Sequence, residues 1–346
     1  MRIVHFAPFA PNGCGLYEAA RDMVVADLNQ GHDSKLVDTG IFINGECIGG
    51  QGRVDLEDTR SRSSIRTHSP LVARDADVLI AHTGAPDPWY SVCQAPLIWM
   101  LHGRPQACFR PEQYGNGSSF SLMANIAEWP RTKAMISFWP YHRQFWSPII
   151  PDHKLFCFDA PPVDCMRFSP DGPRHDFGVM GGKVNVILAD SRREDVDLYE
   201  ITNGAIAFAR ANHGVKFHFY AMEEPLRCWE YMIRELKTLG ALGEVWARRP
   251  NMEEVFRAAD VVLSPHRITT RVIAEALCCG TPVIAADGCV HATWTCRPDD
   301  PESVSSAIEA AVGQYKEVGS KVSEVAKEFS LSKYSLSMES VFDAVL

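Results

Sequence analysis

The sequence predicts an α/β protein built from two doubly wound parallel sheets, each with helices on both faces. Apolar, strand-like runs alternate with helix-like segments along the chain, a pattern typical of parallel β-α units. The alternation pauses in a Pro- and Gly-rich stretch near residues 169–182 and then begins again. A length of 346 residues is enough for two domains of ordinary size. We therefore expect two Rossmann-like domains facing a cleft, where ligands usually bind.

In the first half, residues 2–7 form the first expected strand because they are apolar and rich in β-formers. A loop containing Gly13 and Gly15 follows, and residues 16–28 carry apolar side chains at helical spacing. The later expected strands are 34–38, 78–82, 96–103, 134–137 and 155–158. The intervening segment 41–68 is Gly-rich and polar, so we expect an irregular insertion there.

After the linker the same alternation resumes. Expected strands are 184–189, 215–220, 245–247, 261–263 and 282–284, and expected helices are 198–211, 226–240, 252–259 and 271–278. The tail from residue 302 onward is largely helical. We place the domains at 1–172 and 173–330, and expect a C-terminal helix over 331–346 that packs back on the first domain.

Composition narrows the class of protein. A formal net charge of -9 does not favour a broad nucleic-acid surface, although a local basic cleft is compatible with it. The eleven cysteines include no Cys-x-x-Cys, which argues against a disulfide framework or structural zinc and favours a reducing compartment. We find no apolar run of the roughly 18 residues that span a bilayer and no signal peptide. We expect a cytoplasmic protein.

The most informative segment runs from residue 259 to residue 285. A strand-like run ends near Pro265, and a short helix starting at Arg271 carries Glu275 before a break at Gly280. A helix N-terminus just beyond the C-end of a strand is where an open parallel sheet binds phosphate. The segment therefore indicates a nucleotide-linked ligand.

Four segments, in order, resemble the GT-B glycosyltransferases, and among them the retaining family 4. They are the strand, Gly loop and helix over 3–27, the tripeptide Leu101-His102-Gly103, the passage 158–170 into the linker, and 265–285. The opening residues 6–21 are also similar to glycosyltransferase-like proteins of tailed bacteriophages. The resemblance implies a retaining glycosyltransferase that moves a sugar from a nucleotide-diphosphate sugar to an acceptor hydroxyl without a cofactor. We expect uracil as the base of the donor.

The resemblance and the chemistry of the leaving diphosphate assign the donor site. Cations and N–H groups that face the diphosphate lower the barrier, and we assign this work to Arg192 or Arg193. Arg267 is a third candidate, and it stands where the family has a carboxylate that bonds the donor sugar. The N–H groups of Thr269, Thr270 and Arg271 should face the phosphate, with Glu275 accepting from ribose hydroxyls. The alternative for Arg192 and Arg193 is a solvated turn, and for Glu275 an exposed helix carboxylate.

Further candidates lie in four loops. Gly13 and Gly15 would let the backbone approach the donor, or form a plain turn. Arg248 or Arg249 would stack on the nucleobase, or be a surface pair. His102 would contact the donor sugar or reacting centre, unless it is a core or capping histidine. On the acceptor side we name His82 and Asp87, and a plain turn accounts equally well for the latter.

No metal is expected. The two Asp-x-Asp patterns, Asp75-Ala76-Asp77 and Asp195-Val196-Asp197, are explained as a helix end and a helix start. The acceptor cannot be read from the residues; the phage likeness makes a hydroxymethylated pyrimidine in DNA a candidate, with Arg53, Arg60, Arg62 and Arg66 tracking phosphates. Two alternatives stay open, a sugar-nucleotide 2-epimerase and a non-catalytic nucleotide-sugar binder. The oligomeric state is not predicted.

Overall fold

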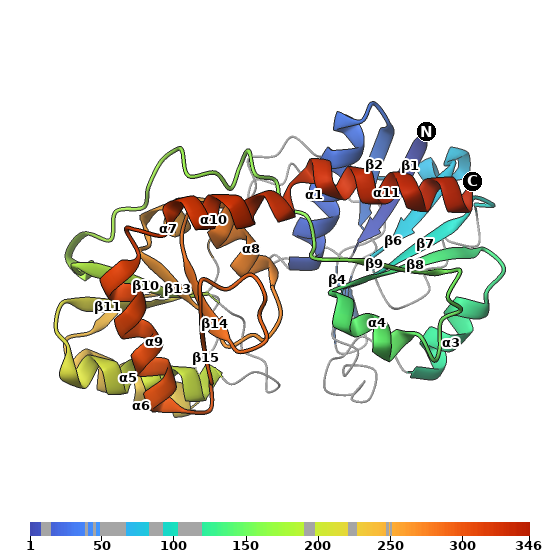
Figure 1. Ribbon diagram of the computed structural model, residues 1–346. Coiled ribbons are helices and arrows are strands. Elements are labelled where there is room, and N and C mark those ends of the chain that lie inside the picture. The colour runs from blue at the N-terminus through green and yellow to red at the C-terminus, as the bar shows by residue number, and fades with distance from the viewer. Residues whose placement is uncertain are drawn as a thin grey trace. The chain divides into compact units, whose positions relative to one another are not determined.

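The computed structural model describes residues 1–7, 15–38, 41–43, 46–48, 67–82, 93–102, 120–189, 198–220, 227–246, 249 and 251–346. They form two compact units (Figure 1). The first contains Met1–Asp164 together with Ser330–Leu346, and the second contains Cys165–Phe329. The C-terminal segment of the chain is therefore part of the first unit.

Seven described strands form the sheet of the first unit, in the order β5-β2-β1-β6-β7-β8-β9. They are β1 (Arg2–Ala7), β2 (Asp33–Asp38), β5 (Thr67–His68), β6 (Val78–Ala81), β7 (Leu97–Leu101), β8 (Thr132–Phe138) and β9 (Leu155–Phe158). Their described pairings are all parallel. A separate antiparallel pair joins β3 (Ile41–Ile43) to β4 (Glu46–Ile48). β6 and β7 are buried along their whole length, as expected of parallel strands covered on both faces.

Alternate side chains of these strands enter two different cores. Phe6, Leu79 and Trp99 belong to one core, whereas Ala7 joins Tyr17 in another. The second core is covered by α1 (Gly15–Asn29), which packs beside α11 (Leu331–Val345) (Figure 1). The remaining helical segments of this unit are η1 (Pro70–Asp75), α3 (Phe120–Glu128) and α4 (Pro140–Trp146). The sheet is thus the middle layer of a Rossmann-like unit.

The second unit repeats this plan with six described parallel strands in the order β12-β11-β10-β13-β14-β15. They are β10 (Val184–Leu188), β11 (Val215–Phe219), β12 (Leu242–Val245), β13 (Val261–Leu263), β14 (Val283–Ala286) and β15 (Trp294–Cys296). The order reverses between β10 and β13, which is the topological switch point of a doubly wound sheet. The strand expected over 245–247 lies earlier, because Leu242 rather than Trp246 packs into the core.

The helices of the second unit are α5 (Leu198–Ala211), α6 (Arg227–Thr238), α7 (Met252–Ala258), α8 (Arg271–Cys278), α9 (Pro301–Gln314) and α10 (Gly319–Ala326). Two short 3₁₀ turns, η4 (Gly178–Met180) and η5 (Lys327–Phe329), complete it. α5 and α9 pack directly on each other, and Gly204 of α5 lies against Val304 of α9. Within the described part of the chain, no helix combines the length and apolar character needed to cross a membrane.

Candidate functional site

The N-terminus of α8 lies at the switch point of the second sheet. β13 ends at Leu263, and α8 begins at Arg271 after a short connection. The N-cap residue of this helix, Thr270, makes no side-chain capping hydrogen bond, and its buried Oγ1 has no hydrogen-bond partner among the described residues. The first turn holds no acidic residue. A helix start that lacks a side-chain cap and carries the positive end of the helix dipole is suited to an anionic group such as phosphate.

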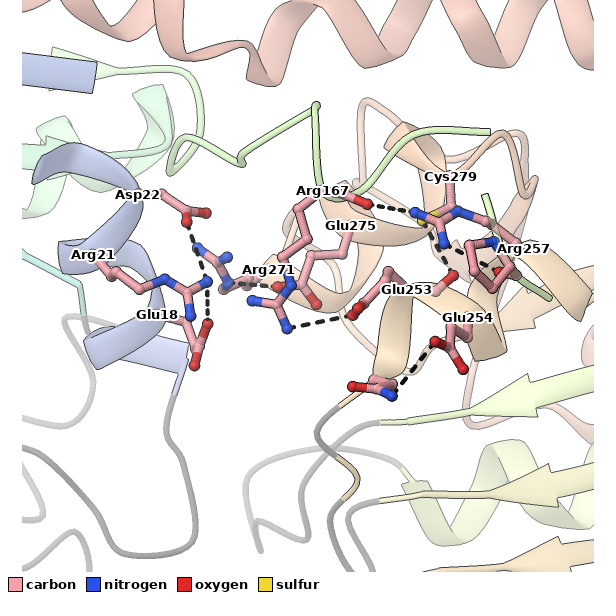
Figure 2. A network of polar contacts seen from close by, with 12 residues as sticks. Glu18, Arg21, Asp22, Arg167, Glu253, Glu254, Arg257, Arg271, Glu275 and Cys279 are labelled. Carbon is pink, nitrogen blue, oxygen red and sulfur yellow. Dashed lines mark hydrogen bonds and ion pairs between the residues drawn. The ribbon is translucent and has the colours of Figure 1, made fainter. Parts of the chain in front are cut away.

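A buried ion pair occupies the first turns of α8. Arg271 Nε donates to Glu275 Oε1 at 2.6 Å, and the two side chains are only 10% and 11% exposed (Figure 2). A buried carboxylate is costly unless a cation or hydrogen-bond donors compensate it. Arg271 supplies that compensation here, so Glu275 is held in place as an ionised hydrogen-bond acceptor beside the open helix end. The sequence alternative of an exposed carboxylate does not describe Glu275.

A second group of polar contacts involves residues 167–173, the segment with which the chain enters this unit. Arg167 pairs with Glu253 of α7 at 3.3 Å (Figure 2). Arg257 of α7 donates to the backbone carbonyls of Ser169, Pro173 and Arg167 at 2.7, 3.1 and 2.5 Å. These hydrogen bonds hold residues 167–173 against α7, and α7 packs against α8.

Arg267 and Thr269 precede α8 in different environments. The Arg267 side chain is more than half exposed, and its Nη1 pairs with the carboxylate of Asp287. Thr269 is buried, and its Oγ1 hydrogen-bonds the Nδ1 of His291 at 2.6 Å. The position where the resembled family has a carboxylate therefore carries an arginine bonded to a carboxylate from another part of the same unit.

The C-ends of β11 and β12 carry a polar cluster centred on Glu244, which the sequence analysis missed. Glu244 Oε2 accepts from Tyr220 Oη at 2.8 Å and from Trp246 Nε1 at 3.0 Å. His175 Nε2 lies 3.0 Å from the same oxygen. Burial alone would raise the pKa of Glu244, but the hydrogen bonds from Tyr220 and His175 outweigh it and lower that pKa. The result is a stable carboxylate at the edge of the sheet.

Arg249, one of the two arginines predicted for the nucleobase, belongs to this cluster. Its guanidinium carbon lies 5.4 Å from the Trp246 ring centroid, and its Nη2 lies 3.0 Å from His175 Nδ1. Guanidinium and indole planes both stack on flat ligands. The signal that could have identified the cluster from sequence was an acidic and an aromatic residue, Glu244 and Trp246, at the end of a short strand.

In the first unit, the structure joins the two predicted histidines by a hydrogen bond. His82 follows β6 and His102 follows β7, and His82 Nδ1 lies 2.8 Å from His102 Nε2. His82 Nε2 lies 2.9 Å from Nδ1 of His5 in β1, whose own Nε2 lies 2.8 Å from Asp27 Oδ2. Burial, with a smaller contribution from the two neighbouring histidines, holds the pKa of His82 well below its usual value.

Sequence reasoning did not find His5 or Asp27. The available signal was a titratable residue inside an apolar strand and another on the apolar face of a helix. Gly15 is the exposed first residue of α1. Asp75 ends η1, and Asp77 pairs with Arg2 at 3.1 Å. The other predicted site residues and basic or acidic candidates lie outside the described residues: Gly13, Arg53, Arg60, Arg62, Arg66, Asp87, Arg192, Arg193, Asp195, Asp197 and Arg248.

Comparisons with a protein-family model and with solved structures identify proteins that are similar to this chain. Residues 201–314 match the family model described as "Glycosyl transferases group 1". HepE of Anabaena in complex with UDP-glucose aligns at 12% identity and a TM-score of 0.69, covering 99% of this chain and 100% of that one. An alpha-glucosyltransferase with UDP and a 13-mer DNA containing an HMU base aligns at 13% identity and 0.63, covering 100% and 99%. The chain has the GT-B fold.

A glycosyltransferase from Rickettsia africae is also similar to this chain, at 12% identity, a TM-score of 0.64, and 99% and 97% coverage. None of the curated proteins matches the chain in sequence. The predicted fold class is confirmed, since two Rossmann-like parallel-sheet units of the GT-B type are present. The GT-B fold and the matched segment, which contains α8 with Arg271 and Glu275, support a glycosyltransferase.

Proposed function

We propose that this protein is a retaining glycosyltransferase that takes a sugar from a uridine-diphosphate sugar and transfers it to an acceptor hydroxyl. The observation that carries the proposal is the uncapped start of α8 at the switch point, beside the buried Arg271–Glu275 pair. An anionic diphosphate would occupy the positive helix end, and the adjacent carboxylate would accept from ribose hydroxyls. The similar structures that hold UDP or UDP-glucose support the choice of donor.

In this proposal the protein lowers the barrier by stabilising the leaving diphosphate. Negative charge accumulates on that group as the bond to the sugar breaks, and N–H groups of residues 269–271 would face it. Arg192 or Arg193 would add positive charge, with Arg267 as a third candidate. Arg249, stacked on Trp246, would contact the base. Because these groups perform the work of a bound cation, we expect turnover to persist in EDTA.

The decisive experiment pairs binding with turnover on the full chain. Isothermal titration with UDP, GDP, ADP and UDP-glucose should give measurable affinity for the uridine ligands first. Incubation with UDP-glucose and an acceptor panel should then release UDP and yield a product whose anomeric configuration equals that of the donor. An inverted product would contradict the retaining mechanism. Binding of none of the four nucleotides would overturn the donor site.

Two other outcomes correspond to the alternative functions. Conversion of the sugar nucleotide without any acceptor would indicate a 2-epimerase of the same fold. Tight UDP binding with no turnover across the panel would indicate a nucleotide-sugar binder. In that case the absence of turnover would be explained by Arg267, which pairs with Asp287 and stands where the resembled family has a carboxylate. Chromatography of the sugar nucleotides measures conversion or its absence, and the isothermal titration measures UDP binding.

For the acceptor we propose a hydroxymethylated pyrimidine in DNA. One similar structure contains DNA with an HMU base, which supports this class of acceptor. The net charge of -9 requires that any DNA contact be locally basic. The test compares two duplexes of identical sequence, one with hydroxymethylated pyrimidines and one without, by mass spectrometry of the DNA after incubation with donor. Binding that does not weaken with salt, or transfer to neither duplex, would remove DNA as the acceptor.

A further inference from the structure

The first unit contains a continuous hydrogen-bonded chain of three histidines that ends on a carboxylate. It runs from His102 through His82 and His5 to Asp27, with links of 2.8, 2.9 and 2.8 Å. Neighbouring rings are stacked, with centroids 5.1 and 5.2 Å apart. His5, His82 and Asp27 are buried, and His102 at the outer end is half-buried. Among the described residues no group of three or more such side chains is arranged to hold a metal ion.

The order of the strands explains why these residues meet. β1, β6 and β7 are adjacent in the sheet, and the three histidines lie in β1, just after β6 and just after β7. Asp27 comes from α1, which covers one face of β1. Parallel strands end at the same edge of a sheet, so the chain leads from the helix layer to that edge.

The carboxylate gives the chain a direction. An ionised carboxylate only accepts hydrogen bonds, and Asp27 Oδ2 also accepts from Ser34 Oγ at 2.9 Å. His5 must therefore donate from Nε2, and because a neutral imidazole has one N–H, its Nδ1 is an acceptor. By the same reasoning His82 donates from Nε2 to His5 and accepts at Nδ1. His102 then donates from Nε2, which leaves the lone pair of His102 on Nδ1.

Burial keeps the middle ring of the chain, His82, in the neutral state. His82 is fully buried between two other imidazoles, so an additional proton there would be unfavourable. Among the described residues, His5 from β1 and Ser34 from β2 hydrogen-bond the Asp27 carboxylate, and Tyr334 from α11 is close enough to feel its charge. Burial and the nearby Asp27 charge raise the pKa of Tyr334, so the phenol stays neutral. His102 packs on Phe138, with ring centroids 5.0 Å apart.

We propose that Asp27, His5 and His82 are positioning residues that set the tautomer of His102, so that its Nδ1 accepts a hydrogen bond from a hydroxyl group of the bound sugar or acceptor. The assignment of a hydroxyl group as the ligand rests on the proposed function, whereas the assignment of the His102 tautomer does not. The buried carboxylate thereby decides, through two rings, whether the outer histidine accepts or donates. The separation of these two parts allows the tautomer to be tested without any turnover.

The first test measures the tautomer in the uniformly ¹⁵N-labelled full chain by two-bond ¹H–¹⁵N correlation spectra. In the unaltered protein the three rings should carry the proton on Nε2. Asp27→Asn replaces an acceptor by an amide that also donates, so the chain loses its direction and His102 should populate the Nδ1–H form. The control Ser34→Ala keeps the carboxylate and should leave the spectrum unchanged. An Nδ1–H form in the unaltered protein, or no change in Asp27→Asn, would overturn the proposal.

The second test uses two substitutions of His82 and measures kcat of sugar transfer. Gln can accept from His102 and donate to His5, so His82→Gln should stay within about threefold of the unaltered protein. His82→Phe breaks both links and should reduce kcat by roughly tenfold or more. Thermal midpoints establish that both variants are folded. If His82→Gln is folded but as slow as His82→Phe, hydrogen-bond positioning through His82 does not explain the effect of this residue on kcat, and the proposal fails. Absence of transfer by the unaltered protein would contradict the proposed function and leave the spectroscopic result standing.

Discussion

Arg271 Nε and Glu275 Oε1 lie 2.6 Å apart across one turn of α8, and both side chains are almost completely buried. The spacing of four residues brings the two side chains together on one face of the helix. Because the pair lies at an uncapped helix start, the carboxylate is oriented before any ligand arrives. The contribution of this pair to ligand binding can be measured as a change in the dissociation constant of UDP.

Glu275→Gln should weaken UDP binding by about tenfold, or about 1.4 kcal/mol, because the amide is a weaker acceptor for ribose hydroxyls and leaves Arg271 without its counter-charge. Isothermal titration measures the dissociation constant. The control is Glu324→Gln, which removes an exposed ion pair with Lys327 in the same unit and should change nothing. Equal UDP affinity of Glu275→Gln and the unaltered protein would exclude Glu275 from the donor site.

Arg257→Leu should destabilise the second unit by roughly 3 kcal/mol, since three backbone carbonyls of the entering segment lose their common donor. Urea unfolding followed by tryptophan fluorescence measures the loss. Arg210→Leu serves as the control, because Arg210 is largely exposed and its bond to Glu235 is 3.4 Å long. If both variants unfold at the same urea concentration, the three carbonyl bonds do not stabilise the unit.

Gly204→Ala should cost roughly 1–3 kcal/mol through overpacking between α5 and α9. An added Cβ would lie 2.3 Å from Val304 Cβ. Gly313 provides the matched case on α9, since a Cβ there would meet no described atom within 4 Å. Gly313→Ala should stabilise by about 0.5–1 kcal/mol through helix propensity. Thermal unfolding midpoints should therefore move in opposite directions, and a fall in both would contradict the packing explanation.

The second unit should lose stability as the pH falls, because of His218. Burial lowers the pKa of His218 to about 4, with smaller contributions from His175 and Lys216, which lower it, and from Glu244, which raises it. An unfolded histidine, with a pKa near 6.5, binds a proton first, so unfolding is favoured below that pH. Between pH 7 and pH 5 the free energy of unfolding should fall by roughly 2 kcal/mol.

Hydrogen exchange of the β11 amides at several pH values, after correction for the intrinsic rate, measures this change. His218→Asn removes the titrating group and should flatten the dependence. The control His153→Asn alters an exposed histidine in the other unit and should have no effect on β11. A slope that survives in His218→Asn would assign the pH dependence to another group.

Local patterns in the chain were sufficient for the two sheets and for part of the candidate site. Apolar runs predicted most strands, and helical spacing predicted the helices between them. The position of α8 could be predicted from residues 271–280, because a helix start and the Gly that ends the helix are local signals. The strand β12 was misplaced because apolar residues lie on both sides of its true end, and only burial of Leu242 distinguishes them. Thr269, Thr270, Arg271 and Glu275 were nominated from this segment alone.

Contacts between residues far apart in the chain were decided by the tertiary structure. Glu244 is bonded to Tyr220, and His175 lies against it, because β11 and β12 are neighbours in the second sheet. His5 and His82 are 77 positions apart and meet only because β6 lies beside β1. Periodicity describes which face of a strand is buried, but it does not contain the strand order. For that reason the amino-acid pattern predicted His82 and His102 separately, and only the folded sheet connected them to Asp27.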